Sequence, residues 1–459
     1  MDPKRAKPDT LRELTRTELE ALVVKQSELI EQLRKQVAEL VRKGHRQASP
    51  FSKNKPTANP KRPGRKRGQG VITNRPGPPE QPTDQKVEAS TPEQCPGCGG
   101  EVDWELTDTA TVTDMPQKPD PVVVRYTVPV CRCKKCGQRV RGQAPGLAPD
   151  QMGATAHRLG PGVMAMAHLL HHDLGIPVRK VPMVLSAMTD IAVTASAITQ
   201  DAMRKGAGPV GIAYEQLRDE MKDSPVVHTD DTGWRIGGRN VFLMGFDSDQ
   251  SVVYQIRFQH RNEEVREILP SGFGGVLVTD RGVSYAAKAF DGMKQQKCIG
   301  HLLRNISAVL ETKAGPARGF GMRLKALFQE AMQLAKSPPG ESRMEPVRDL
   351  EDRLVWHLRN RCLKDDDNQR LLNGIGIQMD RNRILTFLTL PGIEPTNNRA
   401  ERILRPAVIA RKVSHCSKNE RGAYAQSAFL SVIQTGRKGI ALGLSSHLTA
   451  VRSVVTQTR

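Results

Sequence analysis

One stretch of the sequence decides the fold: Pro225-Val226-Val227-His228-Thr229-Asp230, an apolar run that ends on an acid. The run Gly275-Val276-Leu277-Val278-Thr279-Asp280 repeats this pattern further along the chain. β-Branched residues favour strands, so each run predicts a strand with an aspartate at its end. Between them, the pattern predicts strands at 240–246 and 251–257, a turn at 247–250 and a helix at 262–269. The sequence therefore predicts an α/β domain built on a mixed sheet, with acids on its first and fourth strands.

A third acid, Glu401, lies just inside a predicted helix. Thr396-Asn397-Asn398 can cap that helix, which places Glu401 in a first turn where the helix dipole favours a carboxylate. Hard divalent cations prefer carboxylate oxygens, so Asp230, Asp280 and Glu401 could together hold two Mg²⁺ or Mn²⁺ ions. Two such ions can clamp the attacking and the leaving oxygen of a phosphodiester. The alternative is that Glu401 only stabilises its helix, paired with Arg402 or Arg405.

The order of the predicted strands is that of a ribonuclease H-like sheet, in which strands one and four are neighbours. Asp230 and Asp280 are therefore expected to meet, and Asp231 is expected to face the other side of its strand. We assign residues 220–440 to this catalytic domain. The long separation between Asp280 and Glu401 predicts a helical insertion at about 305–390, with helices at 322–336 and 346–362.

The chain carries a formal net charge of +20, which suits a polyanionic partner, nucleic acid before an acidic membrane surface. Positive charge is concentrated in a basic, proline-rich linker at 44–92. DNA contacts are predicted for six cations of this linker and of the Glu401 helix: Arg62, Arg65, Lys66, Arg67, Arg402 and Arg405. The alternative is that these residues belong to a solvated linker and a solvated helix face.

A coiled-coil helix is predicted at 11–43, where the chain contains neither Gly nor Pro. Apolar residues repeat there every seven positions, with one polar interruption at Gln26. The two interleaved sets are Val23, Ile30 and Val37, and Leu19, Gln26, Leu33 and Leu40. Such a seam predicts a homo-oligomer, and a helix that packs on the body of its own chain is the alternative.

Two C-x-x-C pairs predict a zinc ribbon at 93–142. The four predicted ligands are Cys95, Cys98, Cys133 and Cys136. Four thiolates complete a tetrahedral structural Zn²⁺ site and leave no open position for a substrate. Cys131 could replace Cys133, and four unrelated buried cysteines are the alternative to a zinc site. The segment 122–128 between the pairs predicts a strand.

Residues 150–215 predict a small helical domain. Helices at 178–188 and 194–205 flank a short break at 189–193, and Thr194 is suited to cap the second helix. Two short helices with a tight turn could form a helix-turn-helix that binds DNA. A plain helical hairpin is the alternative.

No run of 18 or more apolar residues predicts a membrane span. The N-terminal residues are charged and lack the apolar stretch of a signal peptide. We therefore expect a cytoplasmic, nucleoid-associated protein without a membrane partner. Residues 441–459 are assigned to a C-terminal tail.

Four motifs, taken in order, give the chain a family resemblance. They are His228-Thr229-Asp230-Asp231-Thr232-Gly233, Thr279-Asp280-Arg281-Gly282-Val283-Ser284-Tyr285, Cys298-Ile299-Gly300-His301-Leu302-Leu303-Arg304 and Asn397-Asn398-Arg399-Ala400-Glu401-Arg402. This set resembles transposases of the insertion-sequence 66 family, a DDE group with the ribonuclease H-like fold. The resemblance implies that Asp230, Asp280 and Glu401 are a catalytic, metal-binding triad.

The resemblance also implies an activity and a substrate. The enzyme would cleave double-stranded DNA at the ends of an insertion sequence and transfer the freed strands into target DNA. Two alternatives stay open: a ribonuclease H-like nuclease without strand transfer, and a catalytically inactive DNA-binding protein.

Overall fold

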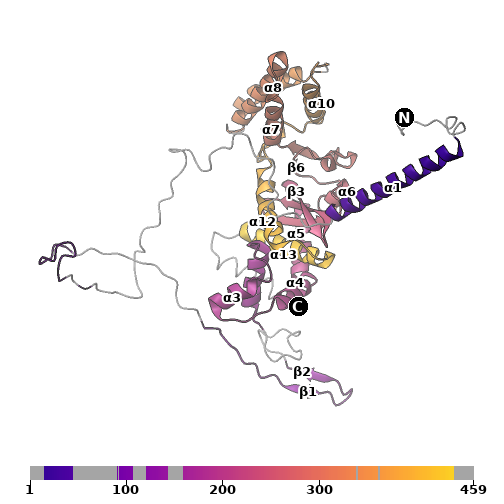
Figure 1. The fold of residues 1–459 in the computed structure, drawn as a ribbon. Coiled ribbons are helices and arrows are strands. Elements are labelled where there is room, and N and C mark those ends of the chain that lie inside the picture. The colour runs from indigo at the N-terminus through magenta and orange to yellow at the C-terminus, as the bar shows by residue number, and fades with distance from the viewer. Residues whose placement is uncertain are drawn as a thin grey trace.

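A computed structural model of the protein describes residues 15–44, 90, 93–106, 120–142, 159–337, 340–359 and 362–438. A five-stranded sheet forms its centre, with β3 and β6 in the middle and helices around them (Figure 1). Most of the predicted linker at 44–92, with Arg62, Arg65, Lys66 and Arg67, lies outside the described residues, and so does the C-terminal tail at 441–459.

The strands of this sheet run in the order β5-β4-β3-β6-β7. Their bounds are Val226–Ile236 for β3, Arg239–Asp247 for β4, Val252–Arg257 for β5, Val276–Thr279 for β6 and Lys294–Lys297 for β7. The first three pair antiparallel, whereas β3, β6 and β7 are parallel to one another. This mixed sheet fits a ribonuclease H-like core, and the predicted pairing of the first and fourth strands is confirmed.

Helices cover both faces of the sheet because apolar side chains line both. On one face, Val227 and Phe246 share a core with Phe429 of α13. On the other, Leu243 packs in a core with Leu404 of α12. Burying each such side chain contributes about 1.5–3 kcal/mol. The helices concerned are α5 (Pro209–Met221), α12 (Asn398–Ser414) and α13 (Glu420–Lys438).

The helices before the sheet confirm the predicted break between two helices. They are α2 (Pro161–His168), the π-helix η4 (Leu169–Asp173), α3 (Val181–Thr189) and α4 (Ala195–Gly206). Asp190 ends α3 with a left-handed φ of 54°. The Thr194 hydroxyl accepts a hydrogen bond from the Ala197 N–H at 3.1 Å, as an N-cap residue does. DNA binding by this pair stays a prediction, as does the division of the chain into domains.

A helical insertion separates β7 from α12, as predicted. It consists of α7 (Ile299–Leu310), α8 (Gly315–Leu334), α9 (Glu341–His357), α10 (Asp366–Asp380) and α11 (Thr386–Thr389). These helices pack around an apolar core that contains Leu324, Phe328 and Leu350 and extends to Val276 and Val278 of β6. The prediction that Pro346 begins a helix is wrong, because α9 starts at Glu341 and Pro346 lies in its second turn. α6 (Asn262–Arg266), at the predicted 262–269, is shorter than expected.

The N-terminal elements are α1 (Arg16–Gly44) and the antiparallel hairpin of β1 (Val130–Arg132) with β2 (Arg139–Arg141). The predicted strand at 122–128 is wrong, since that segment has no regular secondary structure. Val122 is 91% exposed, and apolar strand propensity without a packing surface does not make a strand. None of the helices in the described part of the chain has the length and apolar character of a membrane span.

Candidate active site

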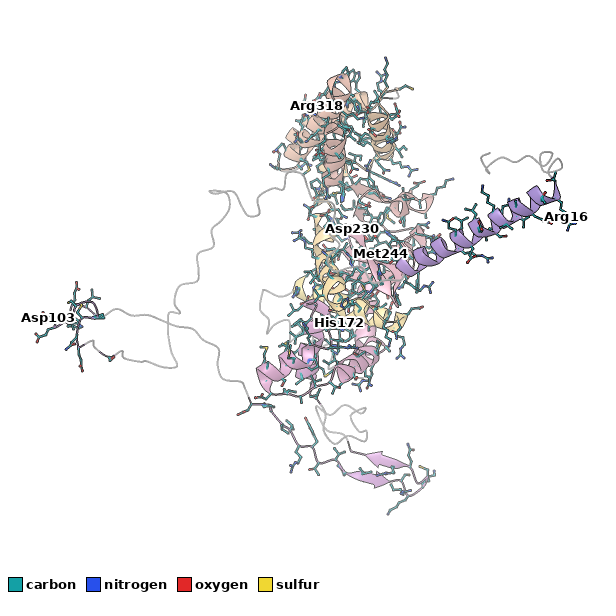
Figure 2. All side chains as sticks on the ribbon, viewed as in Figure 1. Arg16, Asp103, His172, Asp230, Met244 and Arg318 are labelled. Carbon is teal, nitrogen blue, oxygen red and sulfur yellow. The ribbon has the colours of Figure 1, made fainter. Side chains whose placement is uncertain are left out.

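Asp230 and Asp280 lie side by side because they follow the same register on neighbouring parallel strands. His228 of β3 pairs with Val278 of β6. Asp230 and Asp280 each come two residues after this pair. Neighbouring strands are about 4.8 Å apart, and residues at one level of parallel strands point to the same face. Asp230 lies between the helical insertion, marked by Arg318, and the helices marked by His172 (Figure 2).

The electrostatics of Asp230 reflect its burial and the acids in its neighbourhood. Burial is the largest cause that raises the pKa of Asp230, which reaches about 7. Asp280, Asp231 and Glu401 raise it further by charge repulsion. The Asp231 N–H opposes them by donating to Asp230 Oδ1 at 2.9 Å.

Gly282, two residues after Asp280, fixes the position of the Asp280 carboxylate. The Gly282 N–H donates to Asp280 Oδ1 at 2.7 Å. A Cβ atom at position 282 would lie 2.9 Å from the same oxygen and 3.2 Å from the ring of Tyr285. Any larger residue would therefore push the carboxylate away.

Asp231 makes a contact of its own outside the three acids. Its Oδ1 lies 3.1 Å from Nδ1 of His260. The His260 carbonyl in turn accepts a hydrogen bond from Ser284 Oγ at 2.6 Å. Asp231 therefore helps to fix the loop that follows β5.

Glu401 is in the first turn of α12, as predicted. Its Oε1 accepts a hydrogen bond from Nη2 of Arg304 at 3.0 Å, and Nε2 of His301 lies 3.8 Å from the same oxygen. Glu401 thus pairs with Arg304 of α7, not with Arg402 or Arg405 of its own helix. Both of those arginines are exposed. Sequence reasoning missed the Arg304 contact, although Arg304 stands in one of the four motifs.

Asn397 joins the helix of Glu401 to the strands of the aspartates. It occupies the N-cap position of α12, within the stretch predicted to cap this helix, although its side chain makes no capping hydrogen bond. Its Nδ2 instead donates to the Thr229 carbonyl at 2.8 Å, because this buried carbonyl needs a donor. Its backbone N–H donates to Cys298 Sγ at 3.2 Å, and the Cys298 N–H donates to the Thr279 carbonyl at 2.8 Å. The residues before Asp230 and Asp280 are therefore tied to the start of α12.

A buried lysine lies beneath Asp280. Lys297 Nζ donates to Thr279 Oγ1 at 2.8 Å, and this hydroxyl donates to the Asp280 carbonyl at 2.7 Å. Burial lowers the pKa of Lys297 to about 7. Sequence reasoning missed Lys297. The one signal in the sequence was its position directly before the motif that begins at Cys298.

Arg399, near the start of α12, holds neighbouring elements together. Arg399 Nε donates to Asp247 Oδ2 at 3.0 Å, and its Nη1 donates to Asp249 Oδ1 at 2.6 Å. These ion pairs hold the turn after β4 against α12. Arg402 and Arg405, the predicted DNA-binding residues of this helix, form no such ion pairs with the residues that the structure describes, and their DNA contacts stay predictions.

The donor chemistry of the three acids fits hard divalent cations, which take carboxylate oxygens. Within the described ranges, however, no three His, Cys, Asp or Glu side chains are close enough together to hold a metal ion. Glu401 is paired with Arg304 of α7 and not with either aspartate. The Mg²⁺ or Mn²⁺ site therefore stays a prediction with a suitable set of ligands.

The two C-x-x-C pairs form turns of the same construction. Gly99 N–H donates to the Cys95 carbonyl at 2.8 Å, and Gly137 N–H donates to the Cys133 carbonyl at 2.9 Å. Both glycines have a left-handed φ of 73°. Nearby backbone N–H groups lower the pKa of Cys95 and of Cys133, which favours the thiolates that zinc binds. The structure does not bring the two pairs together, so the zinc site stays a prediction.

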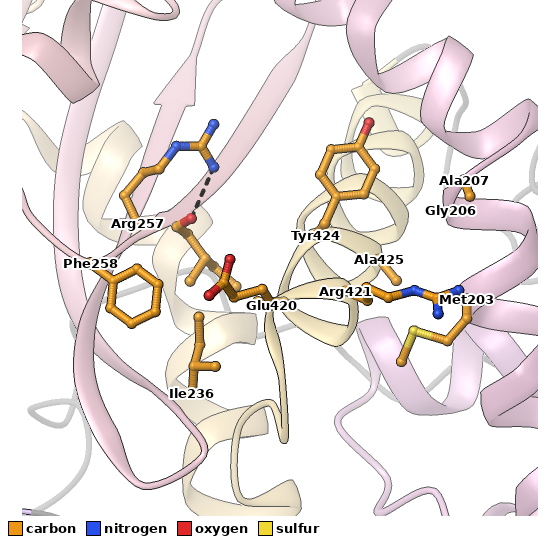
Figure 3. Close-up of a pocket in the computed structure, with 12 residues that line it drawn as sticks. Met203, Gly206, Ala207, Ile236, Arg257, Phe258, Glu420, Arg421, Tyr424 and Ala425 are labelled. Carbon is orange, nitrogen blue, oxygen red and sulfur yellow. Dashed lines mark hydrogen bonds between the residues drawn. The ribbon is translucent and has the colours of Figure 1, made fainter.

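A separate cavity of about 450 Å³ lies between α4, β5 and α13 (Figure 3). Its walls include Met203, Ile236, Phe258 and Tyr424. Ile236 is six residues along β3 from Asp230, a distance of about 20 Å. The cavity is therefore distinct from the cluster of acids.

The chain matches the sequence model of a known protein family. The sequence model described as "Transposase IS66 family" matches residues 157–425 of the 459-residue chain. The matched range contains all three predicted catalytic acids and most of the sheet and helices described above. No curated protein matches the chain. Since the match covers more than half of its length, the chain belongs to the IS66 family of transposases.

Proposed function

We propose that this protein is a DDE transposase that cleaves DNA at the ends of an insertion sequence and joins them to target DNA. Asp230, Asp280 and Glu401 are its catalytic carboxylates. One observation supports the proposal: burial and, after it, the charges of Asp280, Asp231 and Glu401 raise the pKa of Asp230, which lies on a strand next to that of Asp280. Clusters of carboxylates with perturbed pKa values are typical of functional sites.

The chemistry needs no covalent link between protein and DNA. Mg²⁺ or Mn²⁺ held by the three acids would stabilise the charge on the attacking and leaving oxygens of a phosphodiester. The chain supplies these acids from rigid elements that Asn397 ties together. Water first hydrolyses one phosphodiester and frees a 3′-OH. That hydroxyl then bonds to a phosphorus of target DNA, whose own 3′ oxygen leaves.

The charges and the N-terminal elements suit double-stranded DNA and a second copy of the chain as partners. Arg402 and Arg405 are exposed beside Glu401, and we assign them to phosphate contacts with the transposon end or the target. The basic linker would add contacts through Arg62, Arg65, Lys66 and Arg67. On α1, Val23 and Ile30 are more than half exposed, which supports a homo-oligomeric coiled coil. The four cysteines would hold a structural Zn²⁺, and the protein would work at the nucleoid.

Three single variants test the assignment of the acids: Asp230→Asn, Asp280→Asn and Glu401→Gln. The substrate is a supercoiled plasmid that carries the ends of the element, incubated with Mg²⁺ or Mn²⁺. Each variant should lose cleavage while it still retards the DNA in a gel. The exposed Asp223→Asn variant is the control and should cleave normally. Full cleavage by Asp230→Asn would reject the assignment.

A second assay separates the transposase from the two alternatives. Duplexes that already end in the cleaved 3′-OH are mixed with target plasmid, the protein and Mg²⁺. Joined products support a transposase. Cleavage of intact ends without joining would identify a nuclease, and DNA binding without any metal-dependent cleavage would identify an inactive binder.

A further inference from the structure

We propose that Arg304 is a catalytic residue that binds the scissile phosphate of DNA, and that in the free protein it acts as the counter-ion of Glu401. The proposal rests on the proposed function, because it takes Glu401 as a metal ligand. It adds a role that changes between the free and the loaded enzyme.

The contacts of Arg304 are those of a cation that can leave its partner. Within the described residues, its one hydrogen-bonding partner is Glu401 Oε1, reached through a single nitrogen at 3.0 Å. The Arg304 side chain is 61% exposed. By contrast, Arg399 spans three oxygens of the turn after β4 and is mostly buried. An exposed, one-nitrogen ion pair is weak, so a competing ligand can displace it.

Arg304 competes with a metal ion for the carboxylate of Glu401. Among the described residues, no three acidic, histidine or cysteine side chains are close enough to hold a metal ion, although Glu401 is near enough to raise the pKa of Asp230. A cation that binds Glu401 next to the two aspartates would compete with Arg304 for the charge of this carboxylate, whose Oε1 now accepts the hydrogen bond from Arg304. A guanidinium displaced in this way would lie beside the acids and would need another anionic partner.

A DNA phosphate is the group that would satisfy the released guanidinium. Guanidinium is planar and donates two parallel hydrogen bonds to phosphate oxygens. A cation placed where negative charge develops stabilises the transition state of phosphoryl transfer. His301 lies on the same helix, with Nε2 3.8 Å from Glu401 Oε1, so α7 brings a second polar side chain to this position. Arg304 therefore has two anionic partners in turn: Glu401 in the free protein, and the DNA phosphate in the loaded enzyme.

The test compares Arg304→Gln and Arg304→Lys with a matched control, Arg353→Gln. Arg353 also forms an exposed ion pair, with Glu330, but on α8 and α9 in the helical insertion. Mn²⁺ affinity is measured by calorimetry on the full chain without DNA, and nicking of supercoiled plasmid is measured in saturating Mn²⁺. Circular dichroism checks that each variant is folded.

Arg304→Gln should bind Mn²⁺ about 1.5- to 5-fold more tightly, because the competing counter-ion is gone. It should nick DNA about 100- to 1,000-fold more slowly, because a donor to the phosphate is lost. Arg304→Lys should recover part of the nicking, and Arg353→Gln should match the wild type in both measurements.

Two results would overturn the role of Arg304 while leaving the proposed function intact: weaker Mn²⁺ binding by Arg304→Gln, or nicking within about threefold of the wild type. The first would show that Arg304 only braces Glu401, and the second that it does not touch the phosphate. A wild-type protein that neither binds Mn²⁺ nor nicks DNA would overturn the proposed function, and the role of Arg304 with it.

Discussion

Replacing Asp230 by Asn should make the metal-free protein more stable at neutral and alkaline pH. Asn keeps the shape of the side chain and an oxygen that can accept the hydrogen bond from the Asp231 N–H. It removes the charge that burial and the neighbouring acids Asp280 and Glu401 disfavour. The variant should therefore lose a metal ligand and gain stability, a combination that is common at active sites.

The size and the pH dependence of this effect follow from the pKa of Asp230, which rises from 3.8 to about 7 on folding. At about 1.4 kcal/mol per pKa unit the upper limit is about 4 kcal/mol. Solvent screening of this partly exposed group reduces the free energy to about 1–2 kcal/mol. Below pH 4 the group is protonated in the folded and unfolded states, so it has no effect. Between pH 4 and pH 7 only the unfolded state releases its proton, so stability falls as pH rises, and above pH 7 the penalty is complete.

Thermal unfolding in EDTA, followed by circular dichroism, measures the difference. At pH 8, Asp230→Asn should melt about 2–8 °C above the wild type, since 1 kcal/mol shifts Tm by about 2–4 °C in a domain of this size. At pH 4 the two should melt together. The exposed Asp223→Asn variant should match the wild type at both values. A gain at pH 4 as large as that at pH 8, or no gain at pH 8, would refute the reasoning.

Three other changes test the surroundings of the acids and the N-terminal cysteines. Gly282→Ala should reduce metal-dependent cleavage at least about tenfold, because the new Cβ would lie 2.9 Å from Asp280 Oδ1. Gly292→Ala, whose Cβ would meet no atom within 4 Å, is the control and should cleave normally. Asn397→Ala should destabilise the protein by about 1–3 kcal/mol in urea unfolding, because the buried Thr229 carbonyl loses its donor. When a mercurial reagent reacts with the cysteines of the two C-x-x-C pairs, the purified protein should release one Zn²⁺ per chain, measured with a metal-indicator dye. Release of no zinc would contradict the zinc ribbon.

The sheet and the meeting of two acids could be predicted because their signals are local. Apart from His228, the runs Val226–Thr229 and Val276–Thr279 consist of β-branched or apolar residues, and both lie in strands of the structure. The strand order then brings Asp230 and Asp280 together without any knowledge of side-chain contacts. The helix of Glu401 could be predicted for the same reason, since it carries its own local pattern.

The links between elements could not be predicted, because they depend on where the chain packs. Asn397 was interpreted as a helix cap, yet its side chain satisfies a carbonyl of β3 that lies 168 positions away in sequence. The pairing of Arg304 with Glu401 likewise spans 97 positions. The apolar segment at 122–128 shows the opposite failure: its strand propensity is clear, but the described residues offer it no surface on which to pack.

Anomalous diffraction from crystals soaked in Mn²⁺ tests the central claim most directly. The account predicts one or two manganese peaks within about 2.0–2.4 Å of carboxylate oxygens of Asp230, Asp280 and Glu401, with Glu401 released from Arg304. Manganese bound elsewhere, or an unchanged Glu401–Arg304 pair with no peak between the aspartates, would contradict it.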